Sequence, residues 1–555
     1  MGDALSEMLN LAKKNGVITG LVPELVEGGL THLQYADDTI LFIENNSKNL
    51  SRVKFLLFCF EEMSGLRINY NKSEVFGVCL EEQEQLEIAQ MLNCRVGTFP
   101  MKYLGIPVSD TKLTKSDLNV VAEKIENRLA TWKCGQLSYG GRAVLLNSCL
   151  TSIPMYVMGF YLLYEGNHQR MDAARARFFW QGTGKKKKYH MIRWEALSTP
   201  KEFGGLGFLD SRAMNTALLA KWLFRIECGE SSMCINLLRT KYLGQCSLFQ
   251  KEPKSCSFFW TGLNKVRDWY NYGRGVQLGN GNSTRFWADV WRGDCALNIR
   301  FPRLFRICRE NVATVEGIIS GHQSLSFRRN LGVAEKEELS ELQALTATVR
   351  LREESDVVTW KLENSGKYSA RSLYRFIVNP GCVDLRMVDV WNTRVPLKIQ
   401  IFLWMVWHDR VQITVQLKKR KWGGQIHYKL CGEMEDLDHL FFNCPVALFV
   451  WCWWVRDSLG WSCIPASLGD FQDDFLGGPG DKDNRLTIFL FAGVSWALWR
   501  TRNDWVFDDL LVKHPNQIVH RAFGFLQYWC RLSTKGARTK MEELLTKLHA
   551  ELTKL

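Results

Sequence analysis

The stretch Leu-Gln-Tyr-Ala-Asp-Asp-Thr-Ile-Leu-Phe-Ile, from Leu33 to Ile43, joins two short apolar segments at an adjacent pair of carboxylates, Asp37 and Asp38. Apolar segments of this length on either side of a polar tip predict a β-hairpin with acids at its turn. Aspartate is also common in turns because its side chain hydrogen-bonds the local backbone, so the pair alone is weak evidence of chemistry. A tight turn that brings carboxylate oxygens together nevertheless suits Mg²⁺, the metal of phosphoryl transfer.

Two further motifs follow this pair within about 75 residues, and they sharpen its interpretation. They are Gly65-Leu66 with Asn69, Lys72 and Ser73, and then Tyr103-Leu104-Gly105-Ile106-Pro107. In this order, with Tyr35-Ala36-Asp37-Asp38, they resemble the palm of a reverse transcriptase. The resemblance implies that Asp37 and Asp38 hold catalytic Mg²⁺, that Lys72 approaches the phosphates of a nucleotide, and that Tyr103 and Gly105 position the primer end. Alternatively, Lys72 is an exposed lysine in a turn, and the Tyr103 segment is a strand entering a turn.

The resemblance continues beyond the palm motifs, to the region that follows the polymerase in plant non-LTR retroelements. The matching residues are Trp132, Gly140-Gly141-Arg142, Gly204-Gly205-Leu206-Gly207, Gly279 to Gly281, Phe286-Trp287, Asp289-Val290-Trp291, Asp356 to Trp360 and Gly366 to Tyr374. The family implies RNA-directed DNA synthesis, which needs a third metal-binding carboxylate on an earlier strand. Only 36 residues precede Asp37. We therefore expect a truncated polymerase without independent catalysis; an active enzyme completed by missing upstream palm sequence is the alternative.

The positive charge of the chain is concentrated in its middle third. The net charge is +13 overall, but residues 1–165 carry −4, residues 166–380 carry +14 and residues 381–555 carry +3. All 21 tryptophans lie at or after Trp132. Interleaved aromatic and basic residues suit single-stranded nucleic acid, because bases stack on rings and phosphates meet cations. RNA and DNA are therefore the predicted partners, although core tryptophans and solvated basic residues explain the same pattern. The run of Lys185, Lys186, Lys187 and Lys188 predicts an exposed, phosphate-binding loop.

A second candidate site lies near the C-terminus, where Cys431, His439 and Cys444 fall within 14 residues. Thiolate and imidazole are the preferred ligands of Zn²⁺. We expect Asp438 to orient the His439 side chain without binding the metal itself. Alternatively, Leu440, Phe441, Cys444 and their neighbours form an apolar helix that holds this segment together without metal.

The residues around this cluster resemble the reverse transcriptase zinc-binding domain. They are Trp391, Pro396, Lys398, Phe402, Trp404, Thr414, Leu417, Arg420, His439-Leu440-Phe441 and Cys444. The family pattern also has a cysteine three residues before Cys431, and here that position is Tyr428. His427 is the adjacent candidate for the fourth ligand, but the shift changes the direction of its side chain. Three ligands imply a weaker zinc site or one completed by water.

These patterns predict an α+β protein with a partial polymerase palm, a mainly helical thumb and connection region, and a small zinc-binding-like module. The expected domains are a partial palm at 1–110, a helical thumb-like region at 111–270, a basic connection at 271–380, the zinc-binding-like domain at 381–465 and a helical tail at 466–555. Helical spacing is clearest at 122–129, 213–226 and 336–345, and strands are expected at 39–43 and 357–362. We expect no ribonuclease H domain within this tail.

Composition excludes several other classes of function. The apolar runs are too short to span a membrane. The N-terminus lacks a signal peptide, so the 17 cysteines are expected to be thiols or metal ligands in an intracellular protein, nuclear or cytoplasmic. The chain has no phosphate loop, metalloprotease helix or catalytic serine triad. A retroelement ribonucleoprotein is the expected assembly; the sequence does not indicate an oligomeric state.

Overall fold

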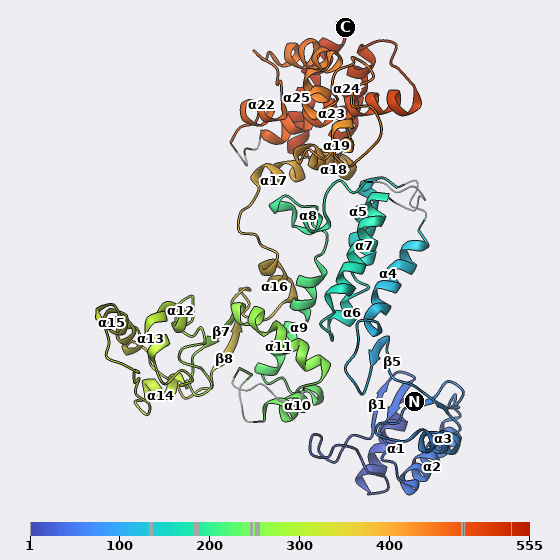
Figure 1. The fold of residues 1–555 in the computed structure, drawn as a ribbon, viewed down its shortest axis with the longest axis vertical. Coiled ribbons are helices and arrows are strands. Elements are labelled where there is room, and N and C mark those ends of the chain that lie inside the picture. Colours follow the sequence, from blue (N-terminus) through green and yellow to red (C-terminus); the bar gives the residue numbers. More distant parts are fainter. Residues whose placement is uncertain are drawn as a thin grey trace. The chain divides into compact units, whose positions relative to one another are not determined.

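The computed structural model describes residues 2–132, 137–181, 189–244, 248–249, 256–478, 481, 483–533 and 535–554. This part of the chain is mainly helical and contains four small sheets of two strands each (Figure 1). Two compact units can be distinguished, and each is described by itself. The first comprises Met1–Asn119, Val157–Leu163 and Asn215–Tyr374, and the second comprises Val120–Tyr156, Tyr164–Met214 and Arg375–Leu555. None of the described helices is both long enough and apolar enough to cross a membrane.

The first unit contains all four sheets. Its elements are α1 (Gly2–Lys14), β1 (His32–Tyr35), β2 (Asp38–Leu41), α2 (Ser47–Ser64), β3 (Glu74–Val75), α3 (Glu82–Leu92), β4 (Arg95–Val96), β5 (Met101–Tyr103), β6 (Ile106–Val108), α10 (Met233–Leu238), α11 (Phe258–Gly273), β7 (Arg274–Gln277), α12 (Leu297–Arg300), α13 (Pro302–Ile307), α14 (Val315–Ile319), α15 (Val333–Ala347) and β8 (Val357–Trp360). Helices α6 (Met155–Met158), α9 (Ser211–Glu227) and α16 (Ala370–Ile377) run from one unit into the other.

The hairpin predicted from the Leu33–Ile43 stretch is confirmed. Strands β1 and β2 are antiparallel, and Tyr35 pairs with Asp38, so Ala36 and Asp37 form the turn. Ala36 has a left-handed backbone with φ 52°. Leu41 at the end of β2 packs against an apolar core that α1 and α2 share. The hairpin therefore stands on two amphipathic helices, with its acidic tip exposed to solvent.

The remaining small sheets near the N-terminus are a parallel pair and a second hairpin. Strands β3 and β4 are parallel and are connected through α3, whereas β5 and β6 are antiparallel. Leu104 and Gly105 form the turn of this second hairpin with φ 48° and 82°, the left-handed conformation that two-residue turns require. No sheet among the described residues exceeds two strands, so a polymerase palm is not shown.

The glycine-rich segment at 279–281 is folded around one carboxylate, Asp356. Its Oδ1 accepts hydrogen bonds from the backbone N–H groups of Gly279 and Gly281, both at 2.8 Å. Its Oδ2 accepts from Thr284 Oγ1 at 2.7 Å and from the hydroxyl and backbone N–H of Ser283. Burial opposes ionisation of Asp356, but these hydrogen bonds outweigh it and hold the pKa of this carboxyl below its usual value. The motif is therefore a structural turn held by a partly buried acceptor.

Asp356→Asn is expected to lower the free energy of unfolding by about 2 kcal/mol at pH 7, because an amide has only one acceptor oxygen for these donors. A carboxyl whose pKa is lowered on folding contributes stability above its unfolded pKa, and this contribution is lost as the pH falls through the folded pKa. The difference in free energy of unfolding between wild type and Asp356→Asn should therefore become smaller below about pH 4. Urea unfolding across this range measures it. Glu353→Gln, at an exposed position nearby, is the control and should leave stability unchanged.

The named elements of the second unit are all helices. Its elements are α4 (Val120–Ala130), α5 (Tyr139–Leu145), α7 (Glu165–Gln181), α8 (Trp194–Ser198), α17 (Leu385–Asn392), α18 (Leu397–Trp407), α19 (Thr414–Lys418), α20 (Pro445–Phe449), α21 (Asp457–Leu459), α22 (Leu468–Asp474), α23 (Asn484–Asp508), α24 (Asn516–Cys530) and α25 (Lys535–Leu552), with π-helical segments η3 (Leu146–Leu150), η6 (His439–Asn443) and η7 (Val450–Arg456). The helices predicted at 122–129, 213–226 and 336–345 are confirmed as α4, α9 and α15. The strands predicted at 39–43 and 357–362 correspond to β2 and β8.

The glycine turn at 204–207 is bonded directly to helix α18. The carbonyl oxygen of Gly204 accepts a hydrogen bond from Trp404 Nε1 at 2.8 Å and lies 2.9 Å from His408 Nε2. Gly204 has φ 87°, and a Cβ at Gly205 would lie 1.8 Å from the carbonyl oxygen of Thr199, so a side chain has no room there. Two motifs about 200 residues apart in the sequence therefore form one local structure.

Candidate metal centre

A tight backbone turn carries the first candidate metal ligand, Cys431. The backbone N–H groups of Tyr428 and Gly432 donate to the carbonyl oxygens of Glu433 and Tyr428, at 2.6 and 2.9 Å. His427 pairs with Met434 in an isolated β-bridge, and Gly432 is left-handed with φ 78°. We refer to residues 426–435 as the knuckle. Its geometry holds Cys431 at the tip of a short hairpin, where the thiol can face a second element.

The other two candidate ligands lie at the two ends of the π-helical segment η6: His439 is its first residue, and Cys444 follows its last. The carboxylate of Asp436 accepts a hydrogen bond from the backbone N–H of His439 at 2.7 Å and so fixes where this segment begins. The backbone N–H of Cys444 donates to the carbonyl oxygen of His439 at 2.7 Å, and Pro445 then opens α20. The two side chains are thus placed by a helix entry and a helix exit.

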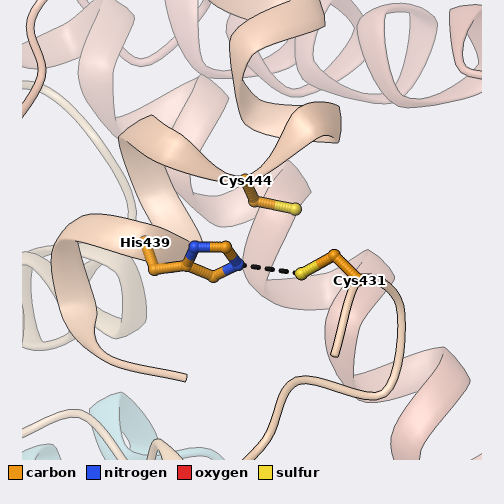
Figure 2. Close-up of side chains that lie close together, drawn as sticks. All are labelled: Cys431, His439 and Cys444. Carbon is orange, nitrogen blue, oxygen red and sulfur yellow. Dashed lines mark hydrogen bonds between the residues drawn. The ribbon is translucent and has the colours of Figure 1, made fainter. Parts of the chain in front are cut away.

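The three ligand atoms meet in one cluster, as Figure 2 shows. The Cys431 Sγ, a His439 ring nitrogen and the Cys444 Sγ all lie within 4.8 Å of one another, and Cys431 Sγ is 3.0 Å from His439 Nε2. Two sulfur atoms and one imidazole nitrogen are a donor set that zinc prefers. Zinc bonds to such ligands are about 2.0–2.3 Å long, so one ion can contact three atoms that lie this close to one another. The residues therefore fit a zinc ion. Other groups of three or more metal-ligating side chains are absent from the residues the model describes.

Burial gives the two thiols of this cluster different environments. Cys444 is only 1% exposed, whereas Cys431 is partly accessible. Burial, with a smaller contribution from the neighbouring Cys431, raises the pKa of the Cys444 thiol to about 11. Without metal, Cys444 is therefore a neutral thiol at pH 7. A bound Zn²⁺ would displace this proton, because the thiolate is the form that binds metal.

Tyr428 stands where the family pattern has its further cysteine, and its aromatic ring packs beside His439. This side chain is 4% exposed, and its ring centre lies 6.0 Å from that of His439. Burial raises the pKa of Tyr428, so its hydroxyl stays protonated and is a poor zinc ligand. His427 is exposed and is not part of the cluster. Successive residues of an extended segment point to opposite faces, which explains why the neighbour of Tyr428 does not replace it.

Asp438 was expected to orient His439, but its carboxylate makes a different contact. Its Oδ1 accepts a hydrogen bond from the backbone N–H of Leu468 at 2.9 Å, which is the start of α22. The residue that acts on the His439 segment is Asp436 instead. Asp438 therefore connects the metal-binding segment to α22.

The last residue of the knuckle, Glu435, forms a buried ion pair with a distant helix. The sequence does not predict this contact. Arg502 of α23 donates to Glu435 Oε1, with 2.9 Å from Nε and 2.7 Å from Nη2. The two side chains are 2% and 1% exposed. Burial raises the pKa of Glu435, although the guanidinium of Arg502 opposes this shift. The only sequence signal is an arginine inside the long apolar stretch of α23, which does not indicate a partner 67 residues earlier.

The residues predicted from the palm resemblance lie on three different segments of the first unit. Asp37 and Asp38 are exposed at the β1–β2 turn, and Lys72 is exposed in a turn in which its backbone N–H donates to Asn69. Tyr103 ends β5, and Gly105 forms the β5–β6 turn. Within the described residues, no third acidic, histidine or cysteine side chain joins Asp37 and Asp38 in a metal-binding group. Lys185, Lys186, Lys187 and Lys188 lie outside the described residues.

Comparison with known proteins agrees with the geometry of the Cys431, His439 and Cys444 cluster. Residues 368–451 match the family described as zinc-binding in reverse transcriptase, and this match includes all three residues. The chain therefore contains a reverse transcriptase zinc-binding domain. A longer match, 26% identical over 414 residues, is to "Putative ribonuclease H protein At1g65750" of Arabidopsis thaliana. It covers 73% of this chain and 66% of that protein, so the chain spans just under two thirds of its length.

A second Arabidopsis thaliana relative is "Uncharacterized mitochondrial protein AtMg00310". The two sequences are 30% identical over 142 residues, which is 25% of this chain but 92% of the relative. The chain belongs to the same family as this mitochondrial protein. Both relatives are plant proteins, in agreement with the plant affinity that the motifs beyond the palm predicted.

Proposed function

We propose that this chain is part of a plant non-LTR retroelement reverse transcriptase, that it binds RNA and DNA, and that it does not polymerise DNA by itself. The observation that carries this proposal is the Cys431, His439 and Cys444 cluster inside a segment that matches the reverse transcriptase zinc-binding family. Zinc held at this cluster would fix the knuckle against η6 and α20. Mg²⁺ enters only if a polymerase site is completed.

The charge distribution supports nucleic acid as the partner. Residues 166–380 carry a net charge of +14, and phosphate-driven binding depends on such excess. In this proposal the partial palm at 1–110 and the helical region at 111–270 precede the basic connection at 271–380, the zinc-binding domain at 381–465 and the helical tail at 466–555. The assembly would be a retroelement ribonucleoprotein in the nucleus or cytoplasm.

The acidic hairpin supports the absence of independent catalysis. Two-metal phosphoryl transfer needs enough carboxylate oxygens to hold both ions. Asp37 and Asp38 are solvent-exposed, and the described residues bring no third ligand to them. The same argument gives no support to ribonuclease H activity in the described residues, although the longer relative carries that name.

An active RNA-directed DNA polymerase is the second candidate, and the β1–β2 hairpin favours it. The pairing of Tyr35 with Asp38 places Asp37 at the turn, with Asp38 directly beside it. A second polypeptide that supplied the earlier palm strands could add the missing carboxylate to this pair. In that case the chain would extend a primer only when both polypeptides are present.

Binding of the purified chain to RNA and DNA oligomers is expected to weaken by at least roughly tenfold between about 50 and 200 mM salt, because each phosphate contact releases a counterion. Fluorescence anisotropy at several salt concentrations measures this effect.

Primer extension on an RNA template, with Asp37→Ala as the matched variant, is expected to give no Asp37-dependent product. Extension by wild type that Asp37→Ala abolishes would contradict the non-catalytic assignment, and the absence of binding at low salt would contradict the nucleic-acid assignment.

A further inference from the structure

A groove of about 350 Å³ in the second unit lies between helix α5, with its π-helical continuation η3, and helix α18. Val144, Asn147 and Ser148 line one side, and Leu397 lines the other. Lys201 and Trp391 also line the groove, together with the apolar side chains of Ala143, Leu206 and Ile401. This volume is in the range of pockets that bind small organic ligands. We refer to this feature as the α5–α18 groove.

The two helices that form the groove approach closely at one point. A Cβ at Gly140 would lie 2.9 Å from the backbone nitrogen of Lys398, so the absence of a side chain at Gly140 allows this contact. The segment after α5 then becomes the π-helix η3, which contributes Asn147 and Ser148 to the groove. A π-helical turn carries an extra residue and often occurs at functional sites. The close approach at Gly140 and the π-helical turn therefore both shape the groove, and both are features of the backbone.

The lining combines an aromatic ring, a cation and an amide with apolar walls. Lys201 Nζ lies 4.5 Å from the centre of the Trp391 ring. Partial burial lowers the pKa of Lys201, which is the expected effect of desolvating an ammonium group. Asn147 is exposed and offers both a donor and an acceptor, and Lys201 supplies the positive charge of the lining. The positive charge at the groove favours an anionic ligand with a flat apolar part.

We propose that the α5–α18 groove binds one nucleotide of a single-stranded nucleic acid. The base lies between the apolar walls beside Trp391, Asn147 hydrogen-bonds the edge of the base, and Lys201 contacts a phosphate. A peptide helix fits less well, since one turn of a helix about 10 Å across already fills roughly 420 Å³. This inference rests on the proposed nucleic-acid function and assigns part of the binding to a defined place.

The test compares a fluorescein-labelled deoxythymidine oligomer with an abasic oligomer of the same length and charge. Wild type is expected to bind the base-containing oligomer roughly tenfold more tightly, because a base in an aromatic pocket adds affinity that phosphates do not. Val144→Trp fills the groove and should abolish this preference. Val144 is 53% exposed, so the larger side chain should not disturb folding. Leu532→Trp is the matched control at a residue of 52% exposure outside the groove.

A second variant separates the phosphate contact from the base contact. Lys201→Gln should reduce the slope of log affinity against log salt by about 0.7 and leave the preference for bases in place. Two results would overturn the groove proposal while leaving the proposed function intact: equal wild-type affinity for the two oligomers, or an unchanged base preference in Val144→Trp. A wild-type chain that binds neither oligomer at low salt would instead refute the proposed function itself.

Discussion

Tyr428→Cys is expected to tighten zinc binding by roughly 100-fold, because it adds a thiolate to a cluster that has three ligands. Structural zinc sites contribute about 10–16 kcal/mol from four ligands, so one further ligand is worth on the order of 3 kcal/mol. The knuckle already has the backbone turn that such a ligand needs, since the Tyr428 carbonyl accepts from Gly432 and Cys431 lies between them. Competition against a coloured chelator measures the change.

Tyr428→Ala is the control that separates the new ligand from the lost aromatic ring. Tyr428 borders a small cavity of about 20 Å³, which it shares with Leu440, Cys444 and Trp505, so either small residue enlarges a void and destabilises the metal-free protein. Only the cysteine variant should gain zinc affinity, and Cys431→Ser in the same background should remove the gain. Equal zinc affinity of the cysteine and alanine variants would show that position 428 does not face the metal.

The local features of this protein could be predicted from sequence because they depend on neighbouring residues. The Leu33–Ile43 hairpin follows from two apolar segments around a turn, and the pairing of Tyr35 with Asp38 confirms it. The convergence of Cys431, His439 and Cys444 was likewise expected from residues within one short segment and from their resemblance to a zinc-binding domain. His427, by contrast, was the candidate fourth ligand from the sequence, and the structure leaves it outside the cluster, because adjacent residues of an extended segment face opposite ways.

Contacts between distant segments could not be predicted, because no local pattern encodes the partner. The hydrogen bond from Trp404 to the carbonyl oxygen of Gly204 joins residues 200 positions apart. Gly205 is required there by the approach of Thr199, which no composition rule reveals. This contact also means that an isolated fragment of residues 385–460 would lose the partner of a buried tryptophan. Zinc content is therefore best measured on the full chain.

Arg502→Met is expected to lower the free energy of unfolding by about 3–5 kcal/mol, because it leaves the Glu435 carboxylate buried without its partner. Methionine retains much of the volume and apolar contact of the arginine stem, which packs beside the Trp499 and Phe507 rings, so the loss reports mainly on charge. Urea unfolding of the full chain measures the change. Arg500→Met is the surface control, because this side chain is 53% exposed and its ion pair with Asp504, one turn along α23 at 3.6 Å, faces solvent; it should cost under about 1 kcal/mol.

The pH dependence of this variant distinguishes an unpaired charge from a packing defect. Burial already raises the pKa of Glu435, and removal of the guanidinium should raise it further. A carboxyl whose pKa is raised on folding destabilises the protein above that pKa, and the penalty is relieved as the pH falls towards the unfolded value. The loss in free energy of unfolding caused by Arg502→Met should therefore become smaller between pH 7 and about pH 5.

Adding Glu435→Gln should recover part of the stability at pH 7 and remove this pH dependence. A loss that is constant with pH would instead assign the effect to packing. Because Glu435 closes the knuckle that carries Cys431, zinc affinity should fall in Arg502→Met and recover with stability in the double variant.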